Sequence, residues 1–115
     1  MSITEFATIT APVRSEQTAA ITDAEAALPV LVRVMKDNTD ESKHVRNILY
    51  SLWQAGSRAS LSEITALEWE TRKAMCAVVL AFGCERERFG FFWMDAIEEA
   101  LTKAGLFDWF LGGGR

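Results

Sequence analysis

The segment from Thr39 to Gly56 constrains the fold most, because it has the pattern of one amphipathic helix with both ends marked. Its apolar residues recur every three or four positions and fall within an arc of roughly 140° on a helical wheel. Thr39 or Asp40 can cap the first free N–H groups, and Gly56 is a residue type that commonly ends a helix. An apolar stripe of this width needs a core to cover it; its members are Val45, Ile48, Leu49, Leu52 and Trp53.

The chain before this segment predicts a tail followed by one helix. Residues 1–21 are rich in Thr, Ser and Ala, which favours a mobile tail over a docked extended arm. Thr22 begins a T-D-A-E capping box, so ordered structure is expected to start there. Pro29 leaves two alternatives, a helix that starts beside it or a helix kinked at the proline. A short turn at residues 37–38 predicts that this helix and the next pack as an antiparallel hairpin.

The stretch from Leu61 to Phe82 contains neither Gly nor Pro and keeps a helical period throughout. It starts with a second capping box at residues 60–63. We favour two helices with a bend near Glu68, because one straight helix of this length would overhang its neighbours. Gly83 is expected to end the second of them. The positions expected to face the core are Leu61, Ile64, Leu67, Thr71, Met75, Val78, Val79 and Phe82.

A last helix is predicted from about residue 91 to residue 104, with Gly105 as its stop. No strand alternation or internal repeat is convincing after the N-terminal tail. With 115 residues, half of them hydrophobic and about a quarter charged, the chain has the size and composition of one folded domain. The sequence therefore predicts an all-α protein, a compact bundle of four to five helices over residues 22–111, with a flexible N-terminal tail and a disordered end at residues 112–115.

Composition disfavours several classes of function. The formal net charge of -4 argues against general nucleic-acid binding, which usually needs a dense basic face. No apolar run approaches the ~20 residues of a membrane span, and the N-terminus lacks the pattern of a secretory signal. Cys76 and Cys84 form neither a disulfide framework nor a CxxC pair, so a cytoplasmic setting is expected.

No group of residues has the spacing of a catalytic, metal or cofactor site, so we expect a protein without enzymatic activity, metal or cofactor. His44 is the single histidine, and a solvated or edge-packed side chain is favoured over a general base. Cys76 and Cys84 are expected to be buried small hydrophobic residues and not ligands. Asp95 and Glu98 share one helix face, where a solvated surface is favoured over a site for a cation or for a partner's arginine.

Two groups of residues are candidates for binding a partner. A basic corner is expected at the turn between the first two helices, where a charged rim is favoured over an anchor for phosphate or for an acidic partner. The C-terminal segment LFDWFL is favoured as an aromatic plug of the core, and its alternative is an exposed interface. The candidate partner-binding residues are Arg33, Lys36, Lys43 and Arg46 in the corner and Phe107, Trp109 and Phe110 in the segment.

The order of several residues resembles a small uncharacterised proteobacterial family found mainly on plasmids, integrative elements and prophages. Its opening pattern, A-L-x-x-L-x-R-V, is matched at residues 27–34, and its T-x-x-S-x-x-V pattern is matched at Thr39, Ser42 and Val45. The resemblance covers roughly residues 26–80 and brings no known activity and no catalytic residue. It implies an accessory protein of a mobile element, a class whose members often inhibit or redirect host machinery by binding to it.

These observations favour a non-enzymatic helical interaction protein that binds and modulates another protein. Inhibition of a host defence protein is a specific version that follows from the resemblance alone. One alternative is a nucleic-acid-associated regulator that uses the basic corner, although the chain has no basic recognition helix. Another alternative is a homodimeric structural protein. A small enzyme would require a cleft in which polar groups converge.

Overall fold

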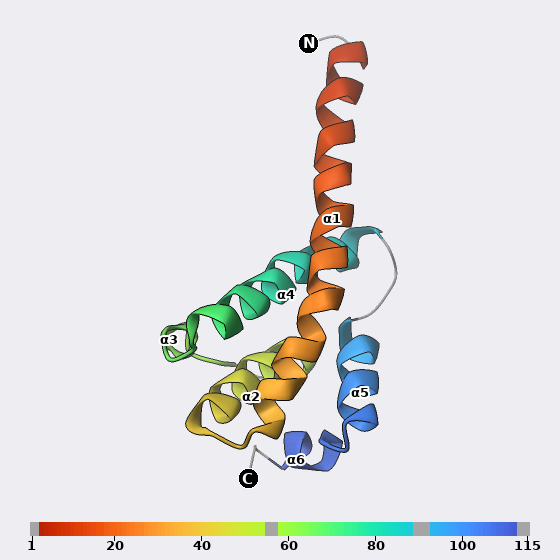
Figure 1. Ribbon diagram of the computed structural model, residues 1–115. Coiled ribbons are helices and arrows are strands. Elements are labelled where there is room, and N and C mark those ends of the chain that lie inside the picture. Colours follow the sequence, from red (N-terminus) through yellow and green to blue (C-terminus); the bar gives the residue numbers. More distant parts are fainter. Residues whose placement is uncertain (1–2, 55–57, 89–92, 113–115) are drawn as a thin grey trace.

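The longest helix, α1, contacts α2, α4 and α5 and organises the domain (Figure 1). The computed structural model describes the backbone of residues 3–54, 58–88 and 93–112, and the side chains of residues 15–54, 58–82 and 95–112. No strand occurs in these ranges, so the predicted all-α class is confirmed. The helices are α1 (Ile3–Lys36), α2 (Asp40–Trp53), α3 (Ser62–Thr65), α4 (Trp69–Arg88), α5 (Trp93–Lys103) and α6 (Phe107–Leu111).

α1 begins much earlier than predicted. It starts at Ile3 and not near Thr22, and the Thr22 hydroxyl donates a hydrogen bond to the Thr18 carbonyl (3.2 Å) within the helix instead of capping an end. The helix also continues through Pro29, which excludes a start beside the proline. Packing of the apolar face around Pro29 outweighs the one backbone hydrogen bond that a proline removes. The predicted mobility of residues 1–21 is a separate property and stays a prediction.

α1 and α2 meet at a tight corner that a buried hydroxyl holds. Asn38 has a φ of 55°, a left-handed conformation that Asn adopts more readily than most residues, and it reverses the chain in the predicted short turn. Ser42 is fully buried; its hydroxyl donates to the Val34 carbonyl (2.6 Å) and accepts from the Thr39 backbone N–H (2.8 Å). α2 therefore folds back from the lower end of α1, as the predicted hairpin requires (Figure 1).

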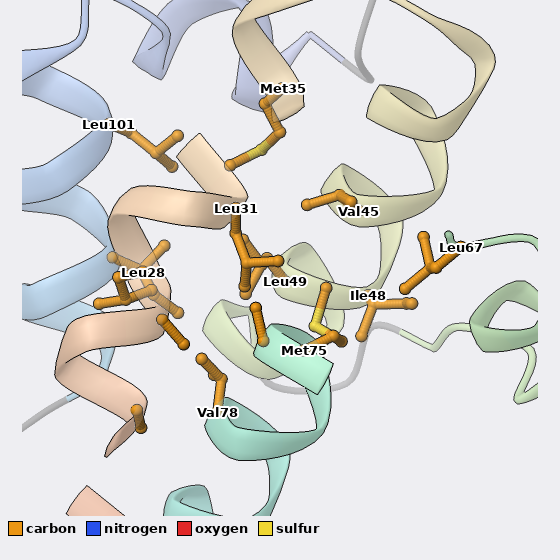
Figure 2. Packing of buried hydrophobic residues seen from close by; sticks show 14 of the residues in the cluster. Leu28, Leu31, Met35, Val45, Ile48, Leu49, Leu67, Met75, Val78 and Leu101 are labelled. Carbon is orange, nitrogen blue, oxygen red and sulfur yellow. The ribbon is translucent and has the colours of Figure 1, made fainter. Parts of the chain in front are cut away.

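The apolar face of α2 is covered by the core, as predicted, and is turned toward α1 and α4 (Figure 2). The helix ends at Trp53, because Gln54 takes an extended conformation with φ -105° and ψ 111°. The predicted stop, Gly56, lies outside the described residues. The buried apolar residues of the face are Val45, Ile48 and Leu49, and its partly buried residues are Leu52 and Trp53.

The predicted bend in the third segment is confirmed. α3 ends at Thr65, and α4 begins at Trp69 after three intervening residues. The predicted stop at Gly83 is wrong, because α4 continues through it to Arg88. A single glycine destabilises a helix by only ~1 kcal/mol relative to alanine, and the Glu and Arg residues that follow are good helix formers.

The one-turn helix α3 is tied to α2 by Glu63. Its Oε1 accepts a hydrogen bond from the Asn47 amide (2.8 Å) and lies 3.2 Å from His44 Nδ1. The predicted capping box at residues 60–63 therefore does not form, and the Ser60 hydroxyl instead accepts a bond from the Ser62 N–H (3.3 Å). His44 has a partly exposed side chain at the edge of the domain, as predicted.

The start of α4 is capped from α2. The Glu41 carboxylate accepts hydrogen bonds from the Glu68 backbone N–H (2.5 Å) and from the Thr71 hydroxyl (3.2 Å). A carboxylate at this place also suits the positive end of the helix dipole. The amphipathic pattern of α2 places Glu41 opposite the apolar stripe, so this link between distant residues was not predicted.

The core lies where α4 crosses α1 and α2 supports both (Figures 1 and 2). Two expected core positions are wrong, because Leu61 is 83% exposed and Val79 is 41% exposed. Cys76, expected to be buried, is also exposed, and the side chain of Cys84 lies outside the described residues. The alanines of α4 face inward, and because Cys76 and Val79 lie at other angles around the same helix, their side chains face the solvent. The buried side chains of α4 are Thr71, Ala74, Met75, Val78 and Ala81.

The C-terminal segment folds back onto α2. Gly105, with a φ of 73°, follows α5 as the predicted stop. In α6, Phe110 is fully buried, and its ring centroid lies 5.5 Å from that of Tyr50 and 5.8 Å from that of Trp53. Arg46 Nε donates a hydrogen bond to the Phe110 carbonyl (2.8 Å), and the guanidinium carbon lies 4.1 Å from the Tyr50 ring centroid. One arginine thus fixes the aromatic plug to the central helix.

Leu49→Ala is expected to lower the free energy of unfolding by ~2–5 kcal/mol, because Leu49 is buried between α1, α2 and α4 and the change leaves a cavity. Urea unfolding followed by tryptophan fluorescence measures the loss. Val79→Ala, at an exposed position of α4, should change the value by less than ~0.5 kcal/mol. A loss below ~1 kcal/mol for Leu49→Ala would contradict its place in the core.

Ser42→Ala is expected to destabilise the protein by ~1–3 kcal/mol, because it removes the hydroxyl that joins the Val34 carbonyl to the Thr39 N–H and leaves that N–H without this acceptor. The Val34 carbonyl keeps its bond from the Asp37 N–H (3.2 Å). Ser51→Ala on the same helix is the control, since the Ser51 hydroxyl only donates to the Ile48 carbonyl within α2 (2.6 Å). Equal stability of the two variants in the same urea titration would show that the corner does not depend on this hydroxyl.

Arg46→Met is expected to destabilise the protein by ~1–3 kcal/mol, because it keeps much of the aliphatic stem and removes the charged donor to α6. Arg33→Met is the matched control, since Arg33 is exposed and should lose less than ~0.5 kcal/mol. Thermal unfolding compares the two variants. If Arg46→Met is as stable as Arg33→Met, the guanidinium does not hold the plug.

Candidate functional site

An open groove runs between α1 and α5 and encloses about 810 Å³. It is a surface groove next to the core, because Leu28 is buried at its base while Pro29 on the same helix is exposed. The described residues that line it are Glu25, Leu28, Pro29, Val32, Arg33 and Lys36 from α1, and Ala96, Glu99, Ala100, Lys103 and Ala104 from α5 and the residue after it. A hollow of this size is in the range of binding pockets.

The groove exists because each of the two helices carries two parallel rows of residues. One row is buried in the core, and the row beside it lines the groove. On α1 the core residues Leu31 and Met35 are flanked by the lining positions, which are spaced at three and four residues. On α5 the core residues are Ile97 and Leu101, and three alanines follow the same spacing beside them. Alanine side chains are too short to meet α1, so the two helices leave an apolar trough.

Charge is distributed unevenly along the groove. α1 and α5 run in the same direction, from top to bottom in Figure 1, so Glu25 lies at the upper end and Lys36 and Lys103 at the lower end. Lys103 pairs with Glu99, with 3.0 Å between Nζ and Oε1. Arg33 and Lys36 are exposed, and among the described residues neither side chain has a hydrogen bond or an ion pair. The lower end is therefore basic.

The predicted basic corner is divided in the structure. Arg33 and Lys36 line the groove, whereas Lys43 is exposed at the start of α2 and is not among the lining residues. Arg46 turns inward to the Phe110 carbonyl. Burial lowers the pKa of Arg46 from its ordinary value, against an opposing effect of Tyr50, and the group still remains charged at neutral pH. Arg46 is thus a stabilising contact of α6 and not a free surface cation.

The predicted aromatic group is divided as well. Phe110 is in the core, as favoured from the sequence, and has no exposed surface for a partner. Phe107 and Trp109 are partly buried against the core, and the Phe107 ring meets the Trp53 ring edge to face at 5.9 Å. These three residues lie on α6 and do not line the groove. Any contact of this segment with a partner would come from the exposed edges of Phe107 and Trp109 or from the exposed Leu111.

Two other surfaces of the domain carry exposed apolar or acidic residues. Trp69, Cys76 and Leu80 are exposed along the outer side of α4, and the Trp69 side chain is the most exposed tryptophan described, at 66%. A shallow hollow on α5 is lined by Asp95, Glu98 and neighbouring residues of the same helix. Within the described residues, no group of three or more His, Cys, Asp or Glu is placed to hold a metal ion. No helix in that part of the chain is long and apolar enough to cross a membrane.

Sequence reasoning identified Arg33 and Lys36 but missed the groove itself. The sequence pattern predicts Val32 on the inner face of the first helix and Ala100 on the inner face of the last, and it indicates Pro29 only as a residue that starts or kinks a helix. The signal that could have found the site is the width of the apolar arc. On each helix it exceeds what one neighbouring helix can cover, because it contains a core stripe and an adjacent stripe of small or half-exposed residues.

Comparison with known proteins places the chain in a family. No curated protein and no solved structure matches it. A family model described as a family of unknown function (DUF7673) matches residues 25–103, which include every lining residue of the groove except Ala104 and exclude α6. The resemblance to an uncharacterised family is thereby confirmed, and the chain belongs to the DUF7673 family.

Proposed function

We propose that this protein is a non-enzymatic interaction module that binds another protein in the α1–α5 groove. The observation that carries the proposal is the apolar trough bordered at its lower end by Arg33 and Lys36, which have no partner among the described residues. Apolar surface that is exposed and rimmed by polar groups marks interaction sites. Apolar grooves between helices commonly bind an amphipathic helix of a partner protein.

The distribution of polar groups favours binding over catalysis. The ionisable residues at the groove lie along its two sides and at its ends, and the exposed Glu25, Arg33 and Lys36 do not converge on one buried point. A catalytic site needs an acid, base or nucleophile held within hydrogen-bond reach of the reacting atoms. Long side chains at a rim are better suited to pairing with charges of a partner.

The alternatives receive less support. A nucleic-acid regulator would need the whole basic corner, but Arg46 is held by α6 and the net charge is -4. Self-association through the exposed side of α4, where Trp69 lies, is the homodimer alternative. The resemblance to mobile-element proteins extends the main proposal to a host protein as the partner, with inhibition or redirection of that protein as the result.

Ala100→Trp is expected to abolish partner binding, because the large ring fills the trough from the α5 side. The measurement is affinity capture from bacterial lysate with the full chain as bait, followed by mass spectrometry of the recovered proteins. Ala19→Trp is the matched control, since it makes the same change at an exposed position of α1 outside the groove. A protein recovered with wild type and Ala19→Trp but lost with Ala100→Trp supports the proposal.

Circular dichroism and thermal unfolding verify that each variant is folded. If Ala100→Trp fails to fold, Ala96→Trp makes the same test one turn earlier on α5. Recovery of the same proteins with all variants would place binding elsewhere on the surface. Sedimentation of the wild type as a dimer that Trp69→Ala converts to a monomer would favour the homodimer alternative instead.

A further inference from the structure

We infer that the groove receives an amphipathic helix that runs antiparallel to α1 and α5, with carboxylates in its first turn and basic residues in its last turn. The inference rests on the proposed function and adds the chemistry and the direction of the bound segment.

The shape favours a helix. The lining residues of α1 extend from Glu25 to Lys36, eleven positions or about 16 Å at 1.5 Å per residue, which equals three turns of a partner helix. The walls are two helices that run side by side, and the groove between them is open along its outer side. A helix covers both walls with one apolar stripe and leaves its polar side in water. A single acyl chain would remain half exposed there.

The charges give the register. Arg33 and Lys36 at the lower end are exposed and without partners among the described residues, so they can pair with carboxylates of a bound segment. Lys103 at the same end is already shared with Glu99 and contributes less. Glu25 at the upper end favours a basic residue. The occupant is therefore acidic at the end that lies beside Lys36 and basic at the end that lies beside Glu25.

The dipoles give the direction. Helices are stabilised by Asp or Glu in the first turn and by Lys or Arg in the last turn. A helix with that ordinary charge distribution matches the groove only if its first turn lies beside Arg33 and Lys36. It then runs antiparallel to α1 and α5, so its dipole opposes theirs favourably. The reverse direction would require carboxylates at the C-terminal end of the bound helix, where they weaken it.

The test uses three synthetic peptides of sixteen residues, a length of about 24 Å when helical. The first has a leucine stripe, Asp and Glu in the first turn and Lys in the last turn. The second exchanges the two charged turns, and the third keeps the composition of the first but scrambles the leucines. Fluorescence anisotropy with labelled peptide and the full-length protein gives each dissociation constant.

Wild type is expected to bind the first peptide about tenfold more tightly than the second, as two partly exposed ion pairs predict, and to bind the scrambled peptide at least tenfold more weakly. The double variant Arg33→Glu, Lys36→Glu should reverse the preference between the first two peptides. This cycle removes the difference in helicity between the peptides, because both peptides are measured on both proteins. A nitroxide at the N-terminus of the first peptide should broaden the NMR signals of Lys36 and its neighbours more strongly than those of Glu25.

Three outcomes overturn the inference. If the double variant leaves the preference unchanged, the charges do not set the register. If the nitroxide broadens the signals near Glu25 more strongly than those near Lys36, the direction is wrong. If no peptide binds at about 1 mM while decanoate, a ten-carbon carboxylate, binds with dependence on Arg33, the occupant is an amphiphile. In each case, loss of the captured protein with Ala100→Trp would still support the proposed function. If Ala100→Trp captures the same proteins as wild type, both the proposed function and this inference are overturned.

Discussion

The hydrogen bond from the buried Ser42 hydroxyl to the Val34 carbonyl sets the angle at which α2 leaves α1, and the rest of the domain depends on that angle. α2 holds three other elements through side chains beyond its apolar face. Glu41 caps α4, Asn47 binds the Glu63 carboxylate of α3, and Arg46 holds the carbonyl of Phe110 in α6. Because these links start from one short helix, a change of the corner would displace α3 and α6 and would remove the Glu41 cap from α4, which itself packs mainly on α1.

Features that depend on neighbouring residues could be predicted from the sequence. The apolar face of α2, the bend before α4 and the stop at Gly105 follow from helical periodicity, from length and from glycine geometry. Ser42 belongs to the T-x-x-S-x-x-V pattern, and the structure gives that pattern a physical meaning. Thr39 and Ser42 close the turn while Val45 enters the core one turn later.

Features that depend on distant residues could not be predicted. Periodicity shows that α4 has an apolar arc, but it does not show which part of the arc another helix covers. The close approach of α1 buries alanines of α4 and leaves Val79 and Cys76 outside. Arg33 and Arg46 look alike in the sequence, yet a carbonyl more than sixty positions away captures one of them. The groove was missed for the same reason, because it is a relation between α1 and α5.

The small residues of α5 favour a binding role for the groove on energetic grounds. A leucine in place of Ala100 would fill part of the trough and bury apolar area against Leu28 and Val32, a type of change that commonly stabilises a protein. The alanine at position 100 therefore makes the protein less stable than a larger apolar residue would. A similar argument applies to Arg33 and Lys36, whose charges suit the C-terminal end of the α1 dipole but pair with no carboxylate among the described residues. Unfilled volume and unpaired charge side by side are expected where a partner supplies what the fold lacks.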